Sequence, residues 1–182
     1  MSQDDLHFHY VCTQEEARDL IERNTLFWIS NCGCRENKGT CQRSRLDVCL
    51  QFRDDTPAWG GGKRVVSKSE VMEILLEART KSLLARPFRG EQDRTRTDGI
   101  CFCCDDCCEY FRNPEEKCDK GIYIEKTNLD ACQNCGTCED LCYFGARTIE
   151  GGELVLKPEA CYGCGLCMAV CPEGCIEMVA RN

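Results

Sequence analysis

The first pattern of apolar and polar positions that indicates regular structure begins at Thr13. Thr13 and Glu16 form a capping box, in which each side chain satisfies a backbone N–H of the first helical turn. Ala17 and Ile21 then recur on one helical face, with acidic and basic residues between them. The pattern predicts a short helix over residues 14–24.

A second helical pattern follows a similar capping box, from Ser67 to Glu70. Apolar residues at helical spacing continue from Val71 and predict a helix that runs to about Leu84. Pro87 cannot continue it, because proline lacks a backbone N–H and clashes with the preceding turn. The polar segment that follows is expected to form a loop as far as Gly99.

The rest of the first 120 positions offers one further element. The apolar run 26–29 leads directly into Cys32 and is expected to pack beneath a loop that carries metal ligands. With the two helices, it predicts a mainly helical, cysteine-rich N-terminal domain over residues 1–120.

The chain changes character after this point. Residues 122–125 resemble a short strand, and Gly151-Gly152, between Ile149 and Leu154, is typical of a hairpin turn. We therefore expect an α+β protein whose last domain, residues 121–182, consists of short hairpins and short helices.

Cysteine is the residue that sets this chain apart: 20 of its 182 residues are cysteines. A short secreted chain uses so many for disulfides, whereas a chain in a reducing compartment uses them for metals. The N-terminus has no apolar run of the secretory kind, and no segment approaches the ~20 apolar residues of a membrane span. The sequence therefore predicts metal ligation, a cytoplasmic location and no membrane span.

The charge of the chain narrows the range of partners. The formal net charge is -8, which argues against nucleic acid because phosphate binding needs a positive surface. The histidines His7 and His9 lie near the N-terminus, where a solvated tail is expected.

The most specific signal is a cysteine run that occurs twice. Its two copies are Cys132-x2-Cys135-x2-Cys138-x3-Cys142 and Cys161-x2-Cys164-x2-Cys167-x3-Cys171-Pro172. In such runs the first three thiolates bind one iron–sulfur cubane and the fourth binds the other cluster, because one tight loop reaches only three corners of a cube. The expected ligand sets are therefore crossed: Cys132, Cys135, Cys138 and Cys171 for one cluster, and Cys161, Cys164, Cys167 and Cys142 for the other.

On these residues the chain resembles the bacterial-type ferredoxins with two [4Fe-4S] clusters, over roughly residues 122–180. Tyr143 departs from the pattern, since the family commonly has proline after the fourth cysteine, but this change removes no ligand. Cys175 occupies a position where the family commonly has alanine, and we interpret it as a small packed residue rather than a ligand. Zinc and disulfides explain the spacing less well, because zinc prefers two separated C-x2-C pairs and cysteines three apart are hard to join.

The resemblance does not extend to the N-terminal cysteines, which form two groups. They are Cys32, Cys34, Cys41 and Cys49, followed by Cys101, Cys103, Cys104, Cys107 and Cys108. Three interpretations stay open: a structural zinc or cluster held by the first group, an additional iron–sulfur centre with ligands from both groups, or redox-active thiols. The lone Cys12 is expected to be a core or surface residue.

The function that this pattern favours is transfer of single electrons between a low-potential donor and a partner enzyme, with redox proteins as partners. The rival is a ferredoxin-fed enzyme or complex subunit whose N-terminal cysteines hold a further centre for chemistry or docking. No dinucleotide-binding motif, flavin signature or catalytic triad is recognisable, so a carrier or complex subunit is favoured over a stand-alone enzyme.

Overall fold

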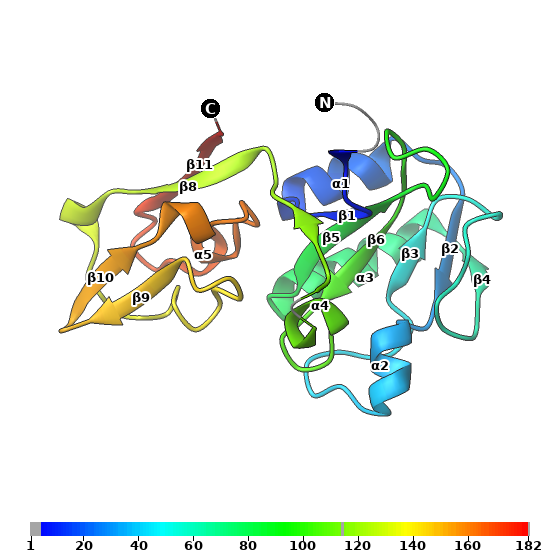
Figure 1. Ribbon diagram of the computed structural model, residues 1–182, viewed down its shortest axis with the longest axis horizontal. Helices are drawn as coiled ribbons and strands as arrows, with labels where there is room; N and C mark the ends of the chain where they lie inside the picture. Colours follow the sequence, from blue (N-terminus) through cyan, green and yellow to red (C-terminus); the bar gives the residue numbers. More distant parts are fainter. Residues whose placement is uncertain (1–4, 114, 182) are drawn as a thin grey trace.

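The computed structural model describes residues 5–113 and 115–181, and Figure 1 shows two modules joined by one connection. The N-terminal module is a seven-stranded sheet in the order β4-β2-β3-β6-β5-β1-β7. Neighbouring strands pair antiparallel, except that β1 and β7 pair parallel. The strands are β1 (His9–Tyr10), β2 (Phe27–Ser30), β3 (Cys49–Gln51), β4 (Arg64–Val66), β5 (Leu84–Arg89), β6 (Thr97–Cys103) and β7 (Cys118–Asp119).

The prediction of a mainly helical N-terminal domain is therefore wrong. The second predicted helix ends early, at Thr80, and the segment expected to end it is strand β5, with Pro87 opposite Ile100 of β6. Strand β6 begins inside the segment expected to be a loop. Most of these strands could not be predicted because they are too short to show an alternating pattern. In β6 apolar residues alternate with cysteines, and cysteine is itself partly apolar, so the alternation is hard to recognise.

The helices that were predicted do form, and both cover one face of the sheet. Helix α1 (Gln14–Glu22) begins with the predicted capping box, since Glu16 N donates to Thr13 Oγ1 and Thr13 N donates to the Glu16 carboxylate. Helix α3 (Lys68–Thr80) is capped by Ser67. The shorter α2 (Gly33–Lys38) and α4 (Glu109–Arg112) lie outside this layer.

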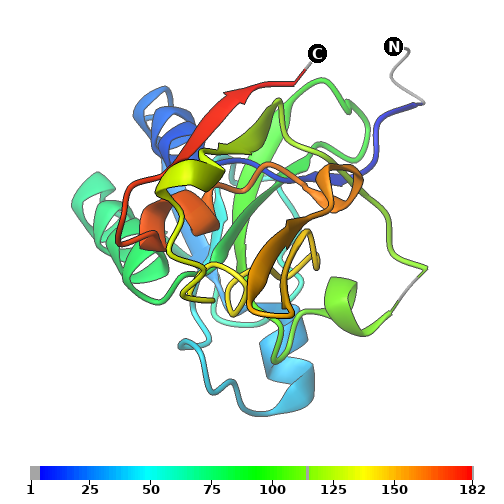
Figure 2. The ribbon, with the colours of Figure 1, turned by 90° about the vertical axis from the view of Figure 1, so that its left-hand side faces the viewer.

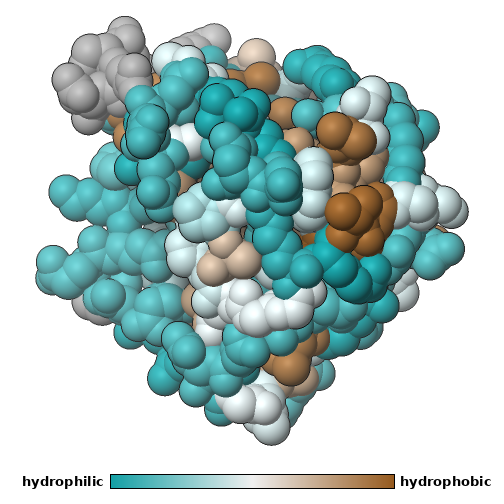
Figure 3. Space-filling model, turned by 90° about the vertical axis from the view of Figure 1, so that its right-hand side faces the viewer, coloured by the Kyte–Doolittle hydropathy of each residue, from teal (hydrophilic) through white to brown (hydrophobic). Residues whose placement is uncertain are grey.

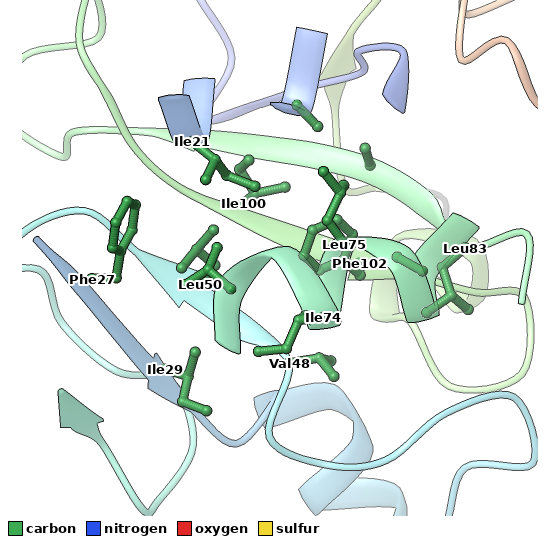
Figure 4. Close-up of a cluster of buried hydrophobic side chains, with 14 of the residues drawn as sticks. Ile21, Phe27, Ile29, Val48, Leu50, Ile74, Leu75, Leu83, Ile100 and Phe102 are labelled. Atoms are coloured by element: carbon green, nitrogen blue, oxygen red, sulfur yellow. The ribbon is translucent and has the colours of Figure 1, made fainter. Parts of the chain in front are cut away.

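The hydrophobic core lies between the sheet and these two helices (Figure 4). Ile21 of α1 and Ile74 of α3 meet Leu50, Ile100 and neighbouring strand residues, all of them essentially inaccessible to solvent. Burial of each such side chain contributes about 1.5–3 kcal/mol to folding, so this face of the sheet supplies most of the module's apolar stabilisation.

The opposite face of the sheet carries cysteines and a buried arginine. Because side chains alternate along a strand, Ile100 and Phe102 of β6 enter the core while Cys101 and Cys103 point to the other side. Arg86 of β5 is paired directly with Cys101, and Cys49 at the start of β3 is in contact with Cys101. The register of three strands thus lines up cysteines and an arginine in one row.

The C-terminal module consists of two antiparallel pairs of strands and short helical turns. The predicted strand is β8, which pairs with β11, and the predicted hairpin is β9–β10, with Ile149 opposite Leu154. Gly151 and Gly152 both have positive φ, which explains the two glycines in this turn. The elements are β8 (Tyr123–Thr127), η2 (Leu129–Ala131), β9 (Arg147–Glu150), β10 (Glu153–Leu156), η3 (Pro158–Ala160), α5 (Leu166–Val170) and β11 (Ile176–Ala180).

The two ends of the molecule differ in what they present. Figure 2 looks onto the C-terminal module, with its hairpins in front of the N-terminal sheet. Figure 3 shows the opposite end, which is mostly hydrophilic with a few separate apolar residues. None of the described helices is long and apolar enough to cross a membrane.

Candidate iron–sulfur and metal sites

Two small hollows in the C-terminal module are lined by the cysteines of the duplicated run. The first hollow is lined by three cysteines of the first copy and the last cysteine of the second, and the second hollow has the converse lining. The cysteines of the first hollow are Cys132, Cys135, Cys138 and Cys171, joined by Cys175; those of the second are Cys142, Cys161, Cys164 and Cys167. Cys175 Sγ lies 3.4 Å from Cys171 Sγ, so this extra thiol is at the edge of the first hollow.

Backbone amides around both hollows point at the sulfurs. Ala146 N lies 3.2 Å from Cys142 Sγ, and Asn134 N lies 3.4 Å from Cys132 Sγ. The loops that bring these amides inward contain Gly136 and Gly145, both with positive φ, and Gly163, between Cys161 and Cys164, has positive φ as well. A Cβ on Gly163 would lie 2.1 Å from the carbonyl oxygen of Tyr123, so glycine is required there. Amides that donate to sulfur stabilise negative charge on a thiolate-bound centre.

A buried arginine lies between the two hollows. The Arg147 side chain is 1 % exposed and pairs with the Glu125 carboxylate at 3.2 Å. Its guanidinium also contacts Cys138 of the first hollow and Cys167 of the second. Its Nε has no hydrogen-bond partner among the described residues. Glu125 compensates the buried charge, and the contacts with Cys138 and Cys167 place the same guanidinium where it can also stabilise negative charge in both hollows.

The second hollow is drier than the first. Burial is the main cause that raises the pKa of Cys164 to about 12 and that of Cys167 to about 11. In the first hollow, Cys135 is exposed. A metal that binds in the second hollow must displace protons, so its binding is coupled to pH.

The N-terminal cysteines do not form the set proposed from their spacing. Cys41 lies with Cys104 and Cys107, not with Cys32, Cys34 and Cys49, and this trio is the one metal-like group of three found within the described residues. The three Sγ–Sγ distances are 3.7, 3.3 and 3.6 Å. Four sulfurs at ~2.3 Å from one zinc ion in a tetrahedron are about 3.8 Å apart, so the trio fits a single ion.

Arg35 accompanies this trio. It is fully buried, donates to the carbonyl oxygens of Arg45 and Phe102, and has Nη2 4.0 Å from Cys104 Sγ. Within the described part of the chain no carboxylate forms an ion pair with it, and its Nε has no partner. Three thiolates around a divalent ion sum to one negative charge, which Arg35 would balance.

The remaining cysteines of the two N-terminal groups line a cavity of about 420 Å³, which we call the cysteine cavity. It lies between the face of the sheet that carries Cys101 and Arg86 and the starts of α2 and α4. These thiols follow one another as interacting neighbours in the order Cys32, Cys34, Cys108, Cys103, Cys101 and Cys49. The second cysteine group is thus split between the two sites. Cys104 and Cys107 belong to the trio, Cys107 also lines the cavity, and Cys101, Cys103 and Cys108 line the cavity alone.

Arg86, His9 and Glu116 complete the cavity wall, and no sequence pattern pointed to the last two. Arg86, 2 % exposed, donates to Cys108 Sγ at 3.3 Å and pairs with Glu116. The expectation of a solvated tail is wrong for His9, because strand β1 holds its Nδ1 2.7 Å from Arg86 Nη2. Burial lowers the pKa of His9, in keeping with a neutral imidazole that accepts from the arginine. The available signal was an arginine inside the apolar run Leu84–Phe88.

An aromatic cluster connects the two modules. Tyr110 and Phe111 of α4 pack against Tyr143, Phe144 and Tyr162 of the C-terminal module, with ring centroids 5.5–6.4 Å apart across the contact. Phe144 and Tyr162 stack on each other at 4.1 Å. The second hollow therefore faces the N-terminal module, and the first faces away from it.

Comparison with known protein families agrees with this geometry over one part of the chain. Residues 131–175 match the 4Fe-4S dicluster domain, so the C-terminal part of this protein contains a ferredoxin-type iron–sulfur domain. No curated protein matches the chain at a significant level of similarity. The family match supports an iron–sulfur electron-transfer role and leaves residues 1–130 outside it.

Proposed function

We propose that this protein carries single electrons between a low-potential donor and a partner enzyme, through two [4Fe-4S] clusters with crossed ligands. The observation that supports this most strongly is the lining of the two hollows, each with three cysteines of one run and the fourth cysteine of the other. Thiolate-bound cubanes change charge by one unit when they accept or release an electron.

The residues around the hollows have separate tasks. Arg147 and the inward-pointing amides favour the more negative, reduced state and so raise the reduction potentials. The aromatic rings of Phe144 and Tyr162 shield the second hollow from water. The chain needs no proton donor or nucleophile for this activity.

The exposed end of the C-terminal module is the proposed docking surface for redox partners. Cys135 at the first hollow is exposed, and acidic residues surround this hollow on both sides of the run. Glu173 lines the hollow, and Asp130, Glu139 and Asp140 flank its cysteines along the chain. An acidic rim favours fast, reversible association with a basic patch on a partner protein.

Crossed ligation is tested with two single variants. Cys142→Ala should disturb the cluster of the second hollow, and Cys171→Ala that of the first, because each cysteine lines the hollow opposite to its own run. Electron paramagnetic resonance of the reduced proteins, after anaerobic reconstitution, measures which cluster changes. Cys175→Ala is the matched control and should leave both clusters in place. If Cys142→Ala altered only the first cluster, the crossed assignment would be wrong.

We further propose that the trio Cys41, Cys104 and Cys107 holds a structural zinc ion that fixes the loop after α2 to the turn after β6. Three protein ligands leave one position of a tetrahedral ion for water. Cys41→Ser should remove about one zinc per chain and destabilise the N-terminal module. Cys12→Ala changes a buried cysteine outside the trio and outside the cysteine cavity, and this variant should retain its zinc. Equal zinc contents in the two variants would contradict this assignment.

A further inference from the structure

We propose that the cysteine cavity holds a third iron–sulfur cluster, bound by Cys32, Cys34, Cys103 and Cys108, which exchanges electrons with the cluster of the second hollow. This inference rests on the proposed electron-transfer function and extends it into the N-terminal module. It assigns to the cavity a centre that the ferredoxin-type domain does not include.

The arrangement of sulfurs favours a cluster over a single ion. The six cavity cysteines form a row of neighbouring thiols around about 420 Å³, and within the described residues no three of their sulfurs lie within 4.8 Å of one another as those of the trio do. In a cluster each thiolate binds a different iron, so the ligands surround a volume rather than a point. The four proposed ligands are consecutive in that row. Cys49 and Cys101 form the remaining pair, at the sheet end of the row.

The polar groups of the wall also suit an anionic centre. Arg86 is buried, its Nη1 donates to Cys108 Sγ, and its Nε has no partner among the described residues. Glu109 N lies 3.4 Å from Cys34 Sγ and supplies a backbone donor on the other side. These donors match those that stabilise negative charge on thiolate-bound iron, and Arg86 supplies one of them while it also pairs with Glu116 at the cavity wall.

The position of α4 connects this cavity with the C-terminal module. Cys108 immediately precedes α4, and Tyr110 of that helix contacts both Tyr162 and Phe144 at the second hollow. The Arg86 guanidinium carbon lies 4.7 Å from the centre of the Tyr110 ring. A continuous series of packed side chains therefore joins the two sites.

The step along this series is a one-electron exchange without bond making or breaking. One electron leaves the centre of the second hollow, which is oxidised, and enters the centre of the cavity, which is reduced. The C-terminal module supplies the reductant, and no further reactant is needed.

The test uses the full chain, reconstituted anaerobically with iron and sulfide. Iron, acid-labile sulfide and zinc per chain are measured for the wild type and for Cys103→Ser/Cys108→Ser. Three cubanes give about twelve irons and two give about eight, so we expect the double variant to lose about a third of the iron while its zinc is unchanged. The matched control, Cys49→Ser/Cys101→Ser, should keep about twelve irons.

The outcomes separate this inference from the function on which it rests. Eight irons in the wild type, unchanged in the double variant, would overturn the third cluster and leave the two-cluster function intact. A colourless protein would overturn both, and loss of the third cluster in the control would overturn this ligand set. If Cys103→Ser/Cys108→Ser does not fold, Cys32→Ser/Cys34→Ser tests the same ligands from the other side of the cavity.

Arg86→Gln gives a readout other than iron content. We infer that Arg86 positions and stabilises the charge of the cavity centre, so its loss should lower the midpoint potential of one of three redox centres. The other two potentials should stay unchanged, because Arg147 and not Arg86 contacts their cysteines. A variant with all three potentials unaltered would contradict this role.

Discussion

Removal of the charge on Arg147 should lower the potentials of both C-terminal clusters. Its guanidinium contacts one cysteine from each hollow, Cys138 and Cys167, and lies in a region that water does not reach. A single substitution would be ambiguous, because it would also leave the buried Glu125 carboxylate without its ion-pair partner. The informative comparison is therefore Arg147→Met made in a Glu125→Gln background, where exactly one charge changes.

The size of the effect follows from Coulomb's law. With an effective dielectric constant of about 20 and a separation of roughly 5–8 Å between guanidinium and cluster charge, the interaction is about 2–3 kcal/mol. For a one-electron couple, about 1.4 kcal/mol corresponds to 59 mV, so each potential should fall by roughly 85–130 mV. The salt dependence should be weak, since buried charges are poorly screened.

Protein-film voltammetry on the anaerobic proteins measures these potentials directly. The matched control is Lys126→Met on β8, whose side chain is 68 % exposed and whose charge is screened by water. We expect a change several-fold smaller there. A fall below about 30 mV for the Arg147 variant, or a fall in one cluster alone, would refute the argument that this side chain acts on both centres through its charge.

Three further changes test the packing around these sites. Burial is the main cause that raises the pKa of Tyr143 to about 12, so the folded protein should lose stability as the pH rises from about 10, where an unfolded tyrosine ionises, towards 12. In denaturant titrations at about pH 9 and pH 11, Tyr143→Phe should show a smaller loss than the wild type, since only this tyrosine's part is removed, and equal losses would contradict the argument. In thermal unfolding, Gly163→Ala should lower the melting temperature of the C-terminal module clearly more than Gly145→Ala. Both glycines have positive φ, but only a Cβ at Gly163 would clash with backbone. Equal falls in melting temperature would show that the clash is relieved. Ile100→Ala should lower the free energy of unfolding, measured with denaturant, by about 2–5 kcal/mol, since this side chain is fully buried between sheet and helices. A loss below about 1 kcal/mol would mean that the core collapses around the gap.

The features that depend on short-range spacing could be predicted from the amino-acid sequence. The helix after Thr13 and the hairpin at Gly151-Gly152 were predictable, because caps and tight turns are formed by residues a few positions apart. The duplicated cysteine run likewise predicts a ferredoxin-type domain, since the geometry of a cubane constrains neighbouring ligands.

The tertiary structure alone decided how the N-terminal cysteines are divided. Cys41 joins Cys104 and Cys107, 63 and 66 positions further along, while Cys103 and Cys108, adjacent to those two, face another site. Of these, only Cys103 belongs to a strand, and Cys104, Cys107 and Cys108 follow it in the turn after β6, so the path of this turn against the loop after α2, not distance along the chain, sets which sulfurs meet. The buried Arg35 and Arg86 depend on the same tertiary contacts, because α2 and β5 bring their guanidinium groups to sulfurs distant in sequence.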